Sequence, residues 1–231
     1  MLYRAGGIAA LLAAVLFRRN IGAEVTLFTG IAAIPQSAAG WFTLLQDIPI
    51  IGLAFLAIFN LVNYALVGLM FLALCAALWP RHKTASAIAL ASGLVGIAVS
   101  FATNIALTML SLSQQYAAAT SQAQRADLLA AGQAVLAFGD PLAIYPSTGA
   151  LMSLLLIAVA GLLFSVAMFR GQLFSRATAL AGLSASACDL IYCLTFAFAP
   201  FLRAFLLAAG GLFWAIWHLL VARRLLQLSK G

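Results

Sequence analysis

A single carboxylate stands inside an apolar stretch near the C-terminal end of the chain. Asp189 lies in SASACDLIYCLTFAFAP, residues 184–200, which holds no other charged side chain. Counting from Arg176 and from Pro200 places Asp189 near the middle of a membrane-spanning helix, because each helical residue rises about 1.5 Å. An unpaired charge at that depth costs at least about 2.5 kcal/mol. The carboxyl group is therefore expected to face other helices or a wet cavity.

Polar side chains in the outer half of the predicted bundle are the candidate companions of Asp189. Amide and hydroxyl groups donate and accept hydrogen bonds, so together they form either a polar binding site or a set of interhelical bonds. Bonds of the second kind contribute roughly 0.6 kcal/mol each and merely fix the packing. Both interpretations stay open. The candidates are Asn60, Asn63, Tyr64, Asn104, Tyr145 and Tyr192.

The other residues with reactive or metal-binding side chains give little indication of a function. His218 is expected to lie at the membrane interface, since Trp214 is one turn away and Arg223 follows it. Trp214 and Trp217 are interpreted as belt or core aromatics. With two histidines in the chain and no nucleotide-binding loop, we assign no catalytic residue, metal ligand or cofactor, and an enzyme is disfavoured.

The amino-acid composition indicates an integral membrane protein. Hydrophobic residues make up 65% of the 231 and charged residues 7%, whereas soluble domains carry roughly 25% charged residues. Long apolar runs favour helices over a membrane barrel. The net charge of +7 comes from basic residues at the ends of apolar runs. The partner is therefore the lipid bilayer and not nucleic acid.

The apolar runs predict an all-α, polytopic membrane bundle that forms one domain over residues 1–231. About six transmembrane helices are expected, with two short interfacial helices at residues 37–47 and 120–141. The first helix reaches only about 24 Å, short of the ~30 Å hydrocarbon core. It is interpreted as a retained helix rather than a signal peptide, because arginines follow where a cleavage site should be. The expected spans are 2–17, 58–79, 84–112, 147–169, 177–199 and 201–222.

Basic residues predict the orientation. Of the twelve lysines and arginines, eight fall with the two termini and the second and fourth connections. Because positive charge is enriched on the cytoplasmic side, both termini are predicted to be cytoplasmic. Small residues recur four apart in several spans, which favours close packing of helices within the bundle. A homo-oligomer or a larger membrane complex is the alternative use of these faces.

Three segments resemble a known family. They are FRRNIGAEV (17–25), FNLVNYALVGLMFLALCAAL (59–78) and LVGIAVSFATNIALTMLSLSQQYAAATSQAQRADLLAAGQA (94–134). Together they are similar to a family of bacterial multi-pass membrane proteins catalogued as a domain of unknown function. The resemblance implies a helical bundle in the bacterial inner membrane, and it brings no activity or site residues.

The favoured hypothesis is a non-enzymatic membrane protein with a polar cluster around Asp189. It would bind a small or lipid-like ligand from the outer side, or take part in membrane sensing. One alternative is an accessory subunit of a larger membrane complex, in which Asp189 only holds helices together. The other is a proton-coupled transporter or intramembrane enzyme that uses Asp189 as its titrating group.

Overall fold

The computed structural model describes residues 1–19, 34–139 and 146–230, and the regular elements in these ranges are helices. This confirms the all-α prediction. The N-terminal helix α1 (Leu2–Arg19) is apolar over Leu2–Leu16. Four longer helical stretches have the length and apolar composition to cross a membrane. They are Ile58–Ala118, Thr148–Gly171, Arg176–Thr195 and Pro200–Leu228.

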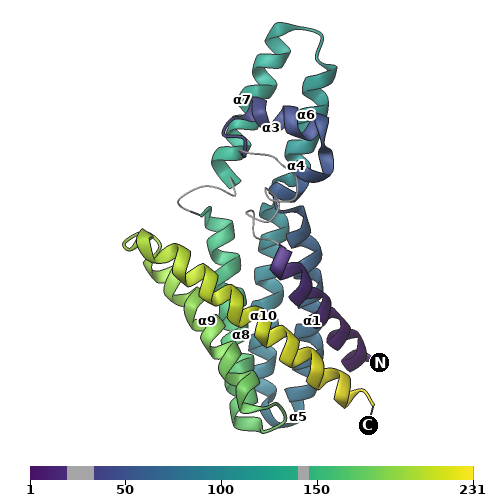
Figure 1. Ribbon diagram of the computed structural model, residues 1–231, viewed down its shortest axis with the longest axis vertical. Helices are drawn as coiled ribbons and strands as arrows, with labels where there is room; N and C mark the ends of the chain where they lie inside the picture. Colours follow the sequence, from purple (N-terminus) through teal and green to yellow (C-terminus); the bar gives the residue numbers. More distant parts are fainter. Residues whose placement is uncertain (20–33, 140–145, 231) are drawn as a thin grey trace.

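The lower part of the molecule in Figure 1 is a helical bundle. Its long helices are α5 (Ile58–Thr103), α8 (Thr148–Gly171), α9 (Arg176–Thr195) and α10 (Arg203–Leu228), with α1 packed against α5 and α10. A short 3-10 turn, η1 (Pro200–Leu202), joins α9 to α10.

Helix α5 folds back on itself at one residue. His82, two residues after Pro80, has non-helical dihedral angles of φ −139° and ψ 51°. The two halves then pack side by side, since Gly93 of the second half lies against the ring of Phe71 in the first. The predicted boundary between the second and third spans is therefore present as a helical hairpin.

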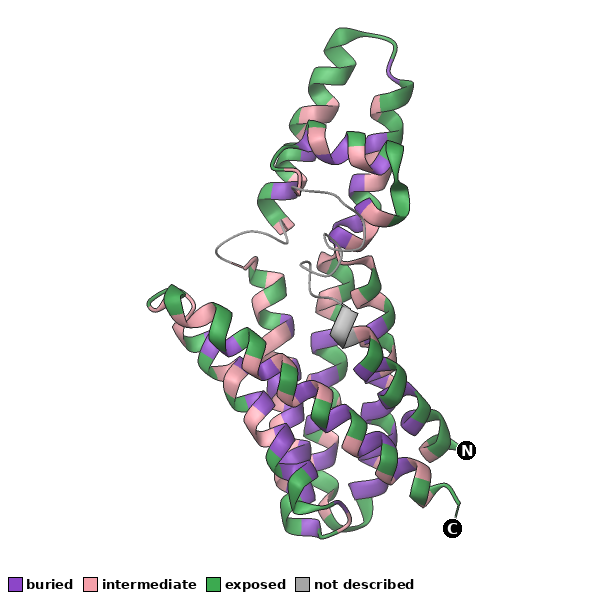
Figure 2. Ribbon diagram, in the orientation of Figure 1, coloured by how far each residue is buried: buried purple, intermediate pink, exposed green. Residues whose placement is uncertain are grey.

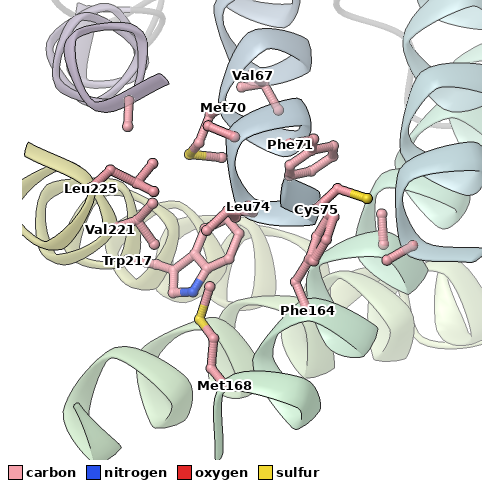
Figure 3. Close-up of a cluster of buried hydrophobic side chains, with 14 of the residues drawn as sticks. Val67, Met70, Phe71, Leu74, Cys75, Phe164, Met168, Trp217, Val221 and Leu225 are labelled. Carbon is pink, nitrogen blue, oxygen red and sulfur yellow. The ribbon is translucent and has the colours of Figure 1, made fainter. Parts of the chain in front are cut away.

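The main hydrophobic core lies between α5, α8 and α10, as Figure 3 shows. Phe71 of α5 meets Phe164 of α8 with ring centroids 5.3 Å apart, and Trp217 of α10 with centroids 6.5 Å apart. Such tilted and edge-on aromatic pairs add about 0.5–1.5 kcal/mol beyond the area they bury. Figure 2 shows the buried residues along the inner faces of these helices, with exposed residues on the outer faces.

Both described ends of the chain lie at the same end of the bundle, which we call the termini end (Figure 1). Gly7 of α1 lies against Leu226 of α10. Two arginines hold the α8–α9 turn at this end: Arg224 Nε donates to the carbonyl of Leu173 at 2.7 Å, and Arg81 donates to the carbonyl of Gly171. Basic side chains thus serve as structural hydrogen-bond donors here.

A second group of helices projects from the opposite end of the bundle, and we call it the head (residues 34–56 and 104–139; Figure 1). Its elements are α3 (Ala38–Asp47), α4 (Pro49–Phe55), α6 (Ala106–Ala118) and α7 (Gln122–Gly139). Ser37 caps α3 by accepting from the backbone N–H of Gly40 at 3.3 Å, as its position before an apolar run predicts. The helices expected at 37–47 and 120–141 are therefore present.

Their position relative to a membrane stays a prediction, but the apolar face of α3 is covered by protein. Trp41 and Phe42 of α3 are buried against α6 and α7 instead of facing outwards. The Ser113 hydroxyl of α6 donates to the carbonyl of Phe42 at 3.1 Å, and Gln46 Nε2 donates to the carbonyl of Ser113 at 3.0 Å. The apolar face of α3 is covered because α6 supplies a partner for it. Residues 106–112, expected to end the third span, belong to that partner, since α5 ends at Thr103.

Candidate functional site

Asp189 lies in the middle part of α9, on the side that faces α10. Its side chain is only 5% exposed, which agrees with the expectation that it turns away from lipid. Helices α9 and α10 approach closely here because Gly210 has no side chain: a Cβ at Gly210 would lie 2.9 Å from Asp189 Oδ1. The absence of a side chain at Gly210 therefore leaves room for the Asp189 carboxylate between α9 and α10.

The partner of the carboxylate is an indole. Trp214 Nε1, one turn along α10 from Gly210, donates to Asp189 Oδ2 at 2.6 Å. A hydrogen bond to an ionised acceptor stabilises a fold by about 1.5–3 kcal/mol, whereas a neutral one contributes about 1 kcal/mol. The backbone of the same tryptophan is engaged as well, because Trp214 O and His218 Nδ1 are 2.6 Å apart. A chain of contacts therefore runs from Asp189 through Trp214 to His218.

The position of His218 relative to the membrane interface stays a prediction, but the structure shows its side chain buried inside the bundle. Its side chain is 2% exposed and lies between two indoles, with ring centroids 5.7 Å from Trp214 and 5.6 Å from Trp217. The sequence does hold a signal for this burial. Trp214, Trp217, His218, Val221 and Leu225 recur at intervals of three or four, so they share one face of α10.

Three buried polar atoms close to this chain of contacts have no hydrogen-bond partner in the described part of the protein. They are Ser165 Oγ of α8, Ser186 Oγ of α9 and Trp217 Nε1 of α10. Two glycines bring them together, because a Cβ at Gly161 would overlap Trp214 and Ser186, and one at Gly182 would overlap Ser165 and Trp217. The interface of α8, α9 and α10 is therefore tight and polar at once.

Of the predicted companions, Tyr64 is the one placed near the carboxylate from another helix. The Tyr64 hydroxyl interacts electrostatically with the Asp189 carboxylate. The adjacent Asn63 is buried on α5, and its Oδ1 has no partner among the described residues. Tyr192, one turn beyond Asp189 on α9, is also buried, and its ring packs against Phe196 with centroids 6.5 Å apart.

Two predicted companions lie towards the head end of α5 and one is outside the described residues. Asn60 is half-buried near the start of α5. Asn104 forms the junction of bundle and head: its Nδ2 donates to the carbonyl of Ala57 at 3.2 Å, and its Oδ1 accepts from the backbone N–H of Ala106 at 3.0 Å. Ala57 has a left-handed conformation with φ 61°, which costs a residue with a Cβ roughly 1–2 kcal/mol. Tyr145 falls outside the described residues.

A cavity of about 320 Å³ lies beside Asn104, where the head meets the bundle. The end of α5, the start of α6 and the last turns of α7 form its wall. Most of the wall is apolar. The lining residues are Ala102, Thr103, Asn104, Ile105, Thr108, Ala134, Val135 and Phe138.

The sequence predicts one polar site that includes both Asp189 and Asn104. The structure instead has two separate features: a buried cluster around Asp189, and a cavity around Asn104. Within the described residues, no three metal-ligating side chains gather at either place. Comparison of the chain with family models, with curated proteins and with solved structures finds no match.

Proposed function

We propose that the chain is a six-crossing protein of the bacterial plasma membrane with both termini in the cytoplasm. The hairpin of α5 supports two crossings and α8, α9 and α10 one each. Helix α1, with 18 residues, is about 27 Å long, close to the ~30 Å hydrocarbon core. The arginines at the termini end agree with the enrichment of positive charge on the cytoplasmic side. The proposal includes membership of the bacterial family that the sequence resembles.

On this topology, the favoured function is the binding of a small, largely apolar ligand at the outer surface of the membrane. The cavity beside Asn104 carries this proposal. Its volume of about 320 Å³ lies at the lower end of the range of ligand sites, roughly 300–1,000 Å³. It lies between bundle and head, at the height where the chain leaves the predicted membrane. The ligand would be a single-chain lipid or a molecule of similar size.

The lining residues define the chemistry of that ligand. The Thr103 hydroxyl donates to the carbonyl of Val99 at 2.9 Å, so it is used within α5. The side chain of Asn104 is used by the backbone at the junction. Thr108 is exposed, lines the cavity, and carries the remaining hydroxyl of the wall. An apolar chain with one hydrogen-bonding group near its end fits these surroundings.

Filling the cavity tests the proposal. Ala134 lines it from α7, so Ala134→Trp should occupy the space that a ligand needs. The measurement is native mass spectrometry of the purified full chain in detergent with added 1-tetradecanol, a single-chain lipid with one hydroxyl group. We expect the parent protein to retain this lipid and Ala134→Trp to lose it. Thr108→Val should weaken the retention without abolishing it, because it removes only the hydroxyl.

Ala130→Trp is the matched control. Ala130 is exposed one turn earlier on α7 and does not line the cavity. Equal retention of 1-tetradecanol by the parent, by Ala134→Trp and by Ala130→Trp would show that the cavity is not the binding site.

A second candidate function is proton coupling at Asp189. The observation that favours it is a buried carboxylate at mid-helix, with Trp214 as donor and the Tyr64 hydroxyl nearby. Intramembrane carboxylates of this kind often belong to proton relays. In vesicles with a trapped pH-sensitive dye, Asp189→Asn should abolish proton movement while the protein stays folded. Equal proton movement in both proteins would exclude Asp189 from such a role.

A further inference from the structure

The turn between α9 and α10 has an unusual composition. Residues 196–202 read FAFAPFL and hold no charged or hydrogen-bonding side chain. Turns that face water are normally rich in Gly, Asn, Asp and Ser, whose side chains and backbones are solvated or bonded locally. This turn is therefore unsuited to an aqueous surface.

The apolar side chains of this turn point outwards. Phe198 is 87% exposed and Phe201 80%. Phe205, in the first turn of α10, and Leu194, in the last turn of α9, are also largely exposed. We call these four residues the aromatic tip. Large apolar side chains that are exposed together on one turn mark a contact with another molecule or with a membrane.

The neighbours of the aromatic tip show where it lies along the length of the bundle. Just below it, Tyr192, Cys193 and Leu206 form a small buried cluster against Leu151 and Leu154 of α8. Leu151 is in the first turn of α8, which begins at Thr148. The tip therefore lies beside the head end of α8, at the boundary of the predicted membrane. Figure 1 shows the α9–α10 hairpin ending to the side of the molecule, away from the head.

The aromatic tip also continues the outer apolar faces of its two helices. Ile191 on α9, and Leu212 and Ile216 on α10, are exposed on the same hairpin. Between Asp189 and Arg223 the chain holds one charged residue, Arg203, which stands between Phe201 and Phe205. A long cationic side chain beside apolar residues is suited to reach lipid phosphates while its neighbours stay in hydrocarbon. Because the tip is a convex turn, a fluid surface can surround it.

We propose that the aromatic tip is inserted into the outer leaflet of the bilayer, with Arg203 at the level of the lipid phosphates. The loop then anchors the α9–α10 hairpin in lipid and never enters the aqueous phase. This inference rests on the proposed topology and is independent of the ligand cavity.

Depth-dependent quenching of a fluorescent label tests this insertion. Phe198→Cys and, separately, Thr120→Cys in the exposed loop between α6 and α7 are labelled with an environment-sensitive nitrobenzoxadiazole dye. Each full-length protein is placed in vesicles of phosphatidylcholine and phosphatidylglycerol. The parent protein, treated in the same way, corrects for label on native cysteines, of which Cys75 and Cys193 are buried. Quenchers are doxyl groups on the lipid chains and iodide in the external water.

The dye at residue 198 should lose most of its emission to the doxyl lipid and little to iodide, and the dye at residue 120 should show the reverse. Strong quenching of residue 198 by iodide would place the tip in water and overturn the insertion. Quenching by neither agent would place it against protein and overturn the insertion equally. A second variant, Phe201→Cys, gives the same reading if Phe198→Cys does not fold. Strong quenching of residue 120 by the doxyl lipid would instead overturn the topology, because it would place the loop between α6 and α7 inside the bilayer.

Discussion

At the residue scale, one buried carboxylate links two helices of the bundle. Asp189 joins α9 to α10 through the Trp214 indole at 2.6 Å. Asparagine keeps an oxygen at the same place, so it can still accept from the indole. Alanine removes the acceptor and leaves a buried N–H unpaired, which costs about 1–3 kcal/mol. The two substitutions therefore separate the hydrogen bond from the charge.

We predict that Asp189→Ala lowers the free energy of unfolding by about 1–3 kcal/mol, whereas Asp189→Asn, which keeps an acceptor for the indole, lowers it by less. The measurement is reversible unfolding in mixed detergent micelles, followed by tryptophan fluorescence. Asp127→Ala is the control, because Asp127 is exposed on α7 and should leave stability unchanged. Equal stability of the parent and Asp189→Ala would show that the Trp214 bond does not hold these helices together.

Two buried hydroxyls in the bundle should respond in opposite ways to removal. Ser165 Oγ has no partner among the described residues, whereas Thr178 Oγ1 is 2.9 Å from the hydroxyl of Ser175. We expect Ser165→Ala to keep or raise the unfolding free energy, and Thr178→Val to lower it by about 0.5–1.5 kcal/mol. The same unfolding assay measures both. A loss for Ser165→Ala as large as that for Thr178→Val would mean that Ser165 bonds to a group such as an ordered water.

At the element scale, helices were easier to predict than the faces they bury. The break after Pro80 and the cap at Ser37 are local signals, and the structure confirms both of them. The partner of an apolar helix face is not a local property. Helix α3 has the pattern of a helix on a membrane surface, yet its partner α6 comes from a segment more than sixty residues later. Periodicity alone cannot distinguish lipid from a second helix as the apolar partner.

The same limit applies to the candidate site. The burial of Asp189 was predictable, because an isolated charge in an apolar run must be shielded. The partner of Asp189 was not predictable, because Trp214 was equally compatible with a position at the membrane interface. Asn104 was grouped with Asp189 by its depth in an assumed continuous span. The end of α5 at Thr103 places Asn104 in a cap between bundle and head instead.

Because α8, α9 and α10 approach closely, a larger side chain at their interface should destabilise the fold. A methyl group at Gly182 would overlap Ser165 Oγ and the Trp217 indole. Gly182→Ala should therefore lower the free energy of unfolding by about 1–3 kcal/mol, the usual cost of overpacking. Ala187→Leu is the control, because Ala187 is exposed on the same helix. Thermal unfolding in detergent measures both, and a Gly182→Ala protein as stable as the parent would contradict the tight interface.

At the scale of the whole molecule, the chain has two hydrophobic cores of different origin. The bundle core lies between α5, α8 and α10. The head core is built from two connections that are separated in sequence by the entire α5 hairpin. The contact between the cores passes through the junction at Ala57 and Asn104, where the two connections leave the bundle. The head should therefore be able to lose its structure while the bundle keeps its own.

Phe42→Ala tests this independence. Phe42 is fully buried in the head core, and truncation of such a side chain costs about 3–5 kcal/mol. In right-side-out vesicles, external trypsin should cleave at Arg125 of the Phe42→Ala protein much faster than in the parent. Thr43→Ala, at the exposed neighbouring position, should leave the rate unchanged. Cleavage within the bundle at the same rate as in the head would contradict separate folding of the two parts.

The split origin of the head has a consequence for biosynthesis. The ribosome delivers α3 long before α6 and α7, and the α5 hairpin must be laid into the membrane between them. During that interval the indole of Trp41 and the ring of Phe42 have no covering helix. On the proposed topology, the nascent chain carries an incomplete apolar module on the outer side of the membrane until residue 139 has been exported. Quality-control proteases and chaperones outside the cytoplasm would meet this protein at that stage, and a stall in translation near residue 100 would expose it to them.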